Sequence, residues 1–424
     1  MSFFNNIKTF IWSFIYLKQK EKSEIIENIL VEQFKKKSCI TIKFIQWFLP
    51  KIECFYNKDE YKEYVRFFKK LEDLYENCNF HDIEYTKSIY LEEFNNEFND
   101  KYKIIEQIAS GSLGQVYKAK NLKTDKLCAI KCLHPDVDKQ IYSWEMCLKL
   151  LSKMPLISYL LRYYFPIDIN TFIKDFKIQS DLRNEANHLI SFYNNYYGND
   201  LIVIPKVYKF SKNILVMSYE EGIIFDDENI SDYLKHKVLI LMRIFCKNNE
   251  LINCYMHGDL HKGNWRIRVK DNDIQLVLYD FGFCWEIPKY MENSSKDIDE
   301  AFFQIAVNEL NIDDFSKACW IFLKKIVPYE NVRGEIINYK KTNGNIRDTD
   351  FLIQLGLSIS RNNDIILDSI ILQSIILYSQ LIGNLQKYNL LEKITGNNKH
   401  LKQYYISNMY DTINFAETYN VFDE

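Results

Sequence analysis

The sequence predicts an α+β protein with a small strand-rich lobe, a larger helical lobe and a helical extension in front of them. The first 110 of the 424 residues contain no glycine and one proline, and charged runs such as 58–77 are typical of solvated helix faces. Near residue 102, short apolar runs separated by glycine, serine and turn residues begin, as is typical of strands. Beyond Gly222 the pattern is mostly helical. The expected parts are a helical extension at 1–100, a strand-rich lobe at 101–222 and a helical lobe at 223–424.

The composition excludes several classes of protein. Twelve glycines and seven prolines are too few for collagen-like, linker-like or proline-rich disordered chains, and an apolar share of 47% is ample for a core. The net charge of −3 comes without a basic stripe interleaved with aromatics, so we expect no nucleic-acid partner. The ten cysteines include no CxxC pair, which argues against a zinc site and favours reduced thiols.

The amino-terminal segment, residues 1–17, is apolar but too short and too interrupted to span a bilayer. It lacks the charged start and the small-residue cleavage site of a secretory signal. We expect a helix packed on the rest of the protein, with a helix lying on a membrane surface as the alternative. A cytoplasmic or peripheral membrane location follows. The apolar residues at helical spacing on one face are Phe3, Ile7, Phe10, Ile11 and Phe14.

A Gly/Ser loop between two predicted strands is the first element that indicates chemistry. The strands KIIEQIAS and GQVYKAKNL are separated by small residues, which let backbone N–H groups approach phosphate oxygens. A plain hairpin turn is the alternative. The residues expected to bind the phosphates of a nucleotide are Ile108, Ala109, Ser110, Gly111, Ser112, Leu113, Gly114, Gln115 and Val116.

Lys131 is the single cation in the apolar run CAIKCL, fifteen residues after Val116. A lysine on a buried strand needs an anionic partner. The position matches a lysine that reaches the α- and β-phosphates of a nucleotide from a third strand; an edge-strand lysine is an equal alternative. Glu185, in the polar helical stretch expected over 175–196, is the acid expected to hold that lysine toward the phosphates. Asp181 lies one turn earlier, so we expect both carboxylates on the same helix face.

Two loop motifs in the helical lobe carry the strongest signal. HGDLHKGN places Asp259 and Asn264 five residues apart, the spacing at which a kinase loop supplies an acceptor-orienting or catalytic aspartate and a metal ligand. Sixteen residues later, LVLYDFGF ends an apolar strand with Asp280, the magnesium aspartate of phosphoryl-transfer enzymes. The order of these motifs behind a Gly/Ser loop and a strand lysine predicts a protein-kinase-like fold.

These motifs resemble those of the UbiB/AarF-type atypical kinases, a family associated with coenzyme Q biosynthesis. The family pattern HxDxHxGN fits 257–264, and its nucleotide-loop ending S-[IL]-[GA]-Q-V fits 112–116. Its LDYxxEAxN helix resembles the segment around Glu185, and its KxGQ motif resembles 43–46. The resemblance covers roughly residues 35–290.

Two family motifs are only partly matched. Lys43 and Gln46 fit KxGQ, but Ile45 stands where the family has glycine. In the ExD motif, Gln179 replaces glutamate while Asp181 matches. The resemblance implies that these motifs fold over the active site and restrain access of protein substrates, and the two departures put that restraint in question.

Together the features predict an ATP- and Mg²⁺-dependent atypical kinase or ATPase, with ATP bound between the lobes. Lys131 and Glu185 would contact the nucleotide, and Asp259 would orient the attacking hydroxyl or water. Asn264 and Asp280 would hold Mg²⁺. The acceptor, whether a small molecule, a lipid or a protein, is not indicated. The alternatives are a serine/threonine protein kinase, a small-molecule kinase of the aminoglycoside or choline type, and a nucleotide-binding scaffold without activity.

Overall fold

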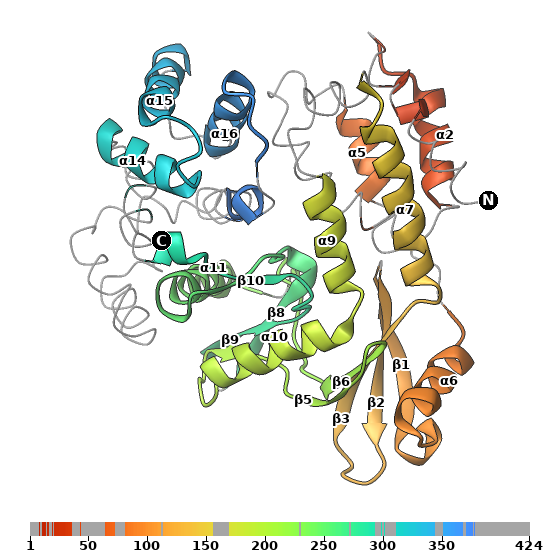
Figure 1. Ribbon diagram of the computed structural model, residues 1–424. Coiled ribbons are helices and arrows are strands. Elements are labelled where there is room, and N and C mark those ends of the chain that lie inside the picture. Colours follow the sequence, from red (N-terminus) through yellow and green to blue (C-terminus); the bar gives the residue numbers. More distant parts are fainter. Residues whose placement is uncertain are drawn as a thin grey trace. The chain divides into compact units, whose positions relative to one another are not determined.

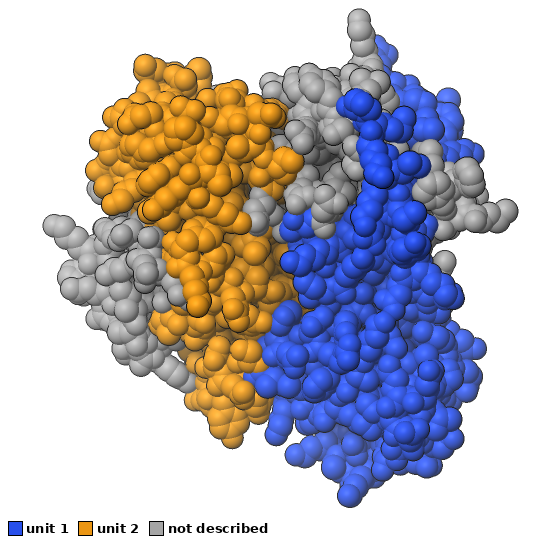
Figure 2. Space-filling model, in the orientation of Figure 1, with its two compact units in different colours: residues 1–165, 169–190, 206–219 blue, residues 166–168, 191–205, 220–424 orange. Residues whose placement is uncertain are grey.

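The computed structural model consists of two compact units (Figure 2). The first comprises residues 1–165, 169–190 and 206–219, and the second comprises 166–168, 191–205 and 220–424. Strands and helices occur in both, so the predicted α+β class is confirmed. The expected three-part division of the chain stays a prediction. The structure describes residues 8, 11–13, 15–16, 19, 21–35, 43, 64–72, 81–111, 113–155, 169–228, 230–270, 273–292, 298, 301, 311–343, 351–367, 370–375 and 377.

Two helices near the amino terminus, α2 (Glu24–Lys35) and α5 (Val65–Glu72), are joined by a buried carboxylate. Glu27 is fully buried and accepts hydrogen bonds from the Tyr16 hydroxyl at 2.9 Å and from Arg66 at 2.8 and 2.9 Å. Burial alone would raise the pKa of Glu27, but these bonds and one from Lys70 hold it below its usual value. Of the expected apolar face, Ile11 is exposed; Phe3, Ile7, Phe10 and Phe14 lie outside the described residues.

Helix α6 (Ile83–Phe94) is fixed at both ends by its caps. The Asp82 side chain accepts from the Glu84 N–H, and Asn95 ends the helix in the left-handed region at φ 51°. Tyr90 of α6 packs with Phe98 of the short helix η1 (Phe98–Asp100) and with the first strand of the sheet that follows. At the C-terminal end of α6, Glu93 accepts hydrogen bonds from Ser211 and, at 2.7 Å, from Asn213.

The first unit contains a five-stranded antiparallel sheet in the order β1-β2-β3-β6-β5 (Figure 1). Alternation along a strand decides what each face carries. In β3, Ile130 and Cys132 are fully buried in the core that α6 covers, whereas Lys131 points to the opposite face, next to Val116 and Leu215 in register. The strands are β1 (Tyr102–Ser110), β2 (Gly114–Asn121), β3 (Leu127–Leu133), β5 (Val207–Phe210) and β6 (Ile214–Ser218).

Three helices follow β3 in the chain: α7 (Val137–Ser152), α9 (Ile169–Gln179) and α10 (Leu182–Asn195). Helices α7 and α9 share a small core of Val137, Ile141, Ile173 and Phe176. The polar helical stretch expected over 175–196 is therefore two helices, which are separated at Ser180 and Asp181.

The second unit has more strands than the sequence pattern indicates. A three-stranded sheet has the order β4-β9-β8, and a two-stranded pair is formed by β7 and β10. The mostly helical pattern expected beyond Gly222 is corrected here. The strand predicted before Asp280 is present as β9, but the unit also contains β8 (WRIRVK), in which basic and apolar residues alternate. The strands are β4 (Ile202–Val203), β7 (Tyr255–His257), β8 (Trp265–Lys270), β9 (Asp273–Leu278) and β10 (Cys284–Glu286).

Helices make up the rest of the second unit. The long helix α11 (Asp232–Asn248), capped by the Ser231 hydroxyl, runs into the π-helix η2 (Asn249–Asn253). In the apolar stretch 365–385, residues 370–375 are helical, and Ile371, Leu372 and Ile375 are buried. Within the residues that the structure describes, no helix is long and apolar enough to cross a membrane. The remaining helices are α12 (Lys289–Glu292), α14 (Ile312–Phe322), α15 (Tyr329–Asn343) and α16 (Phe351–Asn362).

Candidate active site

The predicted nucleotide loop is a tight connection between β1 and β2. The Gly111 N–H donates to the Gly114 carbonyl at 2.9 Å, and Ser110 pairs with Gln115 where the strands meet. A Cβ added to Gly114 would lie 2.6 Å from the Cys132 carbonyl oxygen, so only glycine fits against β3 here. Ile108, Ala109 and Gly111 are exposed, and Leu113 and Val116 are half-buried, whereas Ser112 lies outside the described residues.

Lys131 and Glu185 form the ion pair that the sequence predicts. The Lys131 ammonium lies 2.8 and 2.9 Å from the two Glu185 carboxylate oxygens. The Lys131 side chain is 13% exposed and that of Glu185 is 3% exposed. A charge so buried is tolerated only when it is paired, so each side chain depends on the other. Both belong to the first unit, with Lys131 on the strand next to the one that begins at the nucleotide loop.

In the second unit, the catalytic-loop motif leaves β7 and forms a tight turn through η3 (Lys262–Asn264). The Asn264 amide nitrogen donates to the Asp259 carbonyl at 2.9 Å. The amide oxygen of Asn264 therefore points away from this bond and is a candidate metal ligand. The Asp259 N–H donates to His257 Nδ1 at 3.2 Å. The structure thus brings Asp259 and Asn264 together within one loop.

His257 fixes the orientation of this loop, a role that sequence reasoning did not assign to it. Its Nε2–H donates to the Tyr279 carbonyl at 3.2 Å, so Nδ1 is the nitrogen that accepts from Asp259. Burial lowers the pKa of His257, although the carboxylate of Asp259 opposes this shift. A neutral imidazole satisfies both bonds. The signal in the sequence was the position of this histidine in the HxDxHxGN pattern, two residues before Asp259.

Gly258 packs between two aromatic side chains. A Cβ on Gly258 would lie 1.9 Å from the Trp285 ring and 2.7 Å from the Phe283 ring. Its N–H donates to the Phe283 carbonyl at 2.9 Å, and its carbonyl accepts from Gln373 at 2.6 Å. Gln373, which the sequence showed only as a polar residue in an apolar stretch, therefore supports the catalytic loop.

Asp280 lies two residues after the end of β9, next to the loop that carries Asp259 and Asn264. The Tyr279 N–H donates to the Asn264 carbonyl at 2.8 Å, which joins the two loops. Asp280 has a left-handed backbone, φ 51°, and its carboxylate accepts from the Gly282 N–H at 3.3 Å. The ring of Phe281 is fully buried, with its centroid 4.7 Å from that of His257. The carboxylate and amide oxygens of Asp280 and Asn264 are donors that suit Mg²⁺, which takes few protein ligands beside phosphates and water.

The regulatory candidates have different surroundings. Gln179 is the last residue of α9 and is buried; Lys43 is half-buried, while Ile45 and Gln46 lie outside the described residues. Asp181 was expected one turn before Glu185 on the same helix face, but it precedes the first residue of α10. Its carboxylate accepts from the Arg183 guanidinium at 2.9 and 2.6 Å, which holds the pKa of Asp181 below its usual value.

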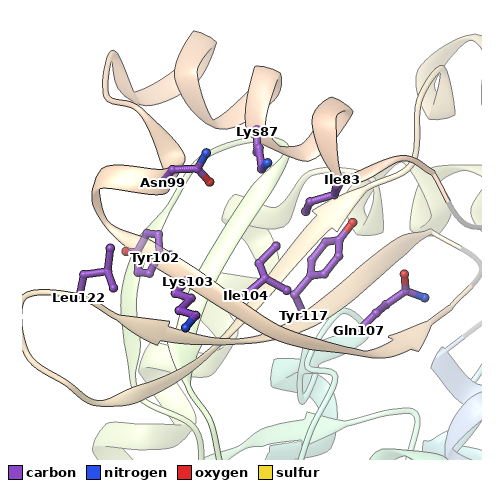
Figure 3. A pocket seen from close by; sticks show the side chains of 9 residues that line it. All are labelled: Ile83, Lys87, Asn99, Tyr102, Lys103, Ile104, Gln107, Tyr117 and Leu122. Carbon is purple, nitrogen blue, oxygen red and sulfur yellow. The ribbon is translucent and has the colours of Figure 1, made fainter.

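A surface cavity lies elsewhere in the first unit, between α6 and strands β1 and β2 (Figure 3). It has a volume of about 620 Å³ and is lined by Ile83, Lys87, Tyr102, Ile104 and Tyr117, among others. These strand residues face the α6 core, whereas Lys131 points to the opposite face of the sheet. We therefore do not assign the nucleotide to this cavity.

Comparisons with known proteins agree with the motifs. The ABC1 atypical kinase-like domain matches residues 73–311, more than half of the chain. A probable serine/threonine-protein kinase, abkC, of Dictyostelium discoideum is 29% identical over 272 residues, which cover 59% of this chain and 36% of that protein. The probable protein kinase UbiB of Pasteurella multocida is 24% identical over 271 residues, which cover 56% of this chain and 50% of that protein.

Among solved structures, the complex of Rv3197 with erythromycin from Mycobacterium tuberculosis matches with a TM-score of 0.44 and 12% identity, over 73% of this chain and 83% of that one. The chain spans about a quarter to a half of the length of the curated relatives it matches. The family match over more than half of the chain is decisive. The chain belongs to the ABC1 atypical kinase-like family, which includes the UbiB/AarF-type kinases.

Proposed function

We propose that this protein is an ATP- and Mg²⁺-dependent atypical kinase or ATPase, which transfers the γ-phosphoryl group of ATP to an acceptor or to water. The observation that carries the proposal is the buried ion pair between Lys131 and Glu185. A cation held in place on a sheet face beside a glycine-containing loop is what binding of nucleotide phosphates requires. Membership of a kinase-like family supports the same reading.

The residues of the first unit would bind the nucleotide. Lys131 would contact the α- and β-phosphates, while Glu185 keeps its ammonium group in a single position. The exposed backbone at Gly111 would approach the phosphates without obstruction by a Cβ. Such groups, fixed before the substrate arrives, stabilise developing charge without reorganising during the reaction.

The residues of the second unit would hold the metal and orient the acceptor. Asn264 and Asp280 would bind Mg²⁺, which when present would neutralise charge on the phosphates. Asp259 would accept a hydrogen bond from the attacking hydroxyl or water. Because His257 fixes the Asp259 backbone through a neutral imidazole, the carboxylate keeps its direction as the acceptor approaches. We leave the acceptor open as a small molecule, a lipid or a protein.

Replacement of Asp280 by asparagine tests the metal assignment. Asparagine tolerates the left-handed backbone at this position, so Asp280→Asn removes the charge without adding strain. We expect this variant to lose the Mg²⁺-dependent rise in melting temperature that ATP gives the wild type, and to lose turnover.

Asp364 offers a matched control for that variant. It is an exposed aspartate that also has a left-handed backbone, φ 50°. Asp364→Asn should keep the response of the wild type to ATP and Mg²⁺. Unchanged ATP hydrolysis in Asp280→Asn would contradict the assignment of Asp280 as a Mg²⁺ ligand.

A further inference from the structure

Two histidines connect the start of helix α6 to the nucleotide loop. His134, directly after β3, is buried, and its Nε2 lies 3.0 Å from the Gly111 carbonyl oxygen. Its Nδ1 lies 2.9 Å from Nδ1 of His81, which directly precedes the residue that caps α6. His81, which lies just before α6, is thus connected to the nucleotide loop through the ring of His134.

The hydrogen-bond requirements of the partners fix both tautomers. The Gly111 carbonyl can only accept, so His134 must carry its proton on Nε2 and accept at Nδ1. His81 must then donate from Nδ1, and its Nε2 accepts from the Thr86 hydroxyl at 2.8 Å. Burial lowers the pKa of both rings, that of His81 to about 4, which keeps this neutral arrangement at physiological pH.

The main chain of the same residues is also tied to the loop. The His134 N–H donates to the Leu113 carbonyl at 2.9 Å, so His134 binds two carbonyl groups of the loop, those of Gly111 and Leu113. Gln115, the second residue of β2, accepts from the His81 N–H at 3.1 Å and donates to the His81 carbonyl at 3.3 Å. Its amide also bonds Gln107 of β1 at 2.9 Å.

We propose that His81 and His134 are positioning residues that hold the nucleotide loop in one conformation and make its order depend on the contact between His134 and the segment that begins α6. The ring of His134 accepts a hydrogen bond from His81 and donates one to the Gly111 carbonyl of the loop. When the bond from His81 is lost, the ring is no longer held in the orientation in which it donates to Gly111. A loop ordered before ATP arrives binds with a smaller loss of conformational freedom. For its role in ATP binding, the inference rests on the function proposed above.

Two polar variants of His81 separate positioning from packing. Asparagine places its amide nitrogen near the position of Nδ1 and can still donate to His134. Glutamine places its amide nitrogen near the position of Nε2, which contacts Thr86 and not His134. In the absence of nucleotide, we expect faster hydrogen–deuterium exchange in peptides covering 106–117 for His81→Gln but not for His81→Asn.

The kinetics should follow the same division. For His81→Gln we expect the KM for ATP to rise about five- to tenfold with little change in kcat, as for loss of one ordering hydrogen bond. His134→Leu, which removes both ring bonds, should raise exchange and KM at least as much. Glu93→Ala is the matched control, because it releases the far end of the same helix from Ser211 and Asn213. It should lower stability while exchange in 106–117 and KM stay unchanged.

The exchange measurement distinguishes this inference from the proposed function. If the wild type binds no ATP, the proposed function fails, while exchange in 106–117 still shows whether α6 orders the loop. Equal exchange in folded His81→Asn and His81→Gln would overturn the inference. So would an increase in exchange with Glu93→Ala as large as that with His81→Gln.

Discussion

The ammonium group of Lys131 lies between the two oxygens of the Glu185 carboxylate, and both side chains are largely buried. Removing one partner leaves the other charged and desolvated. We therefore expect Glu185→Gln to lower the free energy of unfolding by about 3–5 kcal/mol. The double variant Lys131→Met with Glu185→Gln should recover most of that loss, because no unpaired charge remains.

Urea unfolding of the wild type, both single variants and the double variant measures this cycle. ATP turnover should be lost in all three variants, since the lysine or its partner is missing in each. A double variant as unstable as Glu185→Gln alone would show that the pair contributes through packing rather than through charge.

This pair could be predicted from the sequence because a lysine in an apolar strand requires an anion, and Glu185 lies in the helix where kinases carry the acid that pairs with this lysine. The contacts of His81 and His134 could not be predicted. Neutral imidazoles impose no comparable requirement for a charged partner, so nothing in the sequence links these two rings. His257 and Gln373 were missed for a similar reason, because their partners are backbone carbonyls, which a sequence does not distinguish.

At the scale of elements, the pairing of β7 with β10 depends on the small volume of Gly258. We expect Gly258→Ala to lower the free energy of unfolding by about 1–3 kcal/mol, because the added Cβ would overlap the Trp285 ring. A Cβ added to Gly334, inside α15, would meet no other atom within 4 Å. Gly334→Ala should raise stability by about 0.5–1 kcal/mol through helix propensity.

Urea unfolding of the two variants checks this contrast. Similar changes in both would contradict the close packing at the catalytic loop. A partial rescue of Gly258→Ala by a smaller side chain at Trp285 would locate the effect at the contact between them.

The elements of the first unit follow their sequence pattern more closely than those of the second. Strands β1, β2 and β3 match the predicted runs because turn residues separate them and one face of each is apolar. The split between α9 and α10 was missed because the polar helical pattern continues across it, although Ser180 and Asp181 are residue types that often precede a helix. Strand β9 matches the apolar run predicted before Asp280, whereas β8 was missed because its pairing with β9 is long-range information.

For the whole molecule, the family and the α+β fold are established, whereas the chemistry is proposed. The residues of the proposed mechanism come from segments far apart in the chain, from the nucleotide loop near residue 110 to Asp280. The proposed mechanism therefore needs residues of both units. This chain spans half or less of the length of the relatives abkC and UbiB, so the match to them does not identify the acceptor.

The turnover of ATP by the Asp259→Asn variant tests the central claim, that the protein is an enzyme and not only a nucleotide-binding scaffold. Asp259 is proposed to act on the acceptor and not on the nucleotide. We predict that kcat falls by about 10²–10⁴-fold while Mg²⁺-dependent ATP binding stays as in the wild type and in Asp364→Asn. Wild-type binding of ATP without turnover, or equal turnover by wild type and Asp259→Asn, would contradict the account.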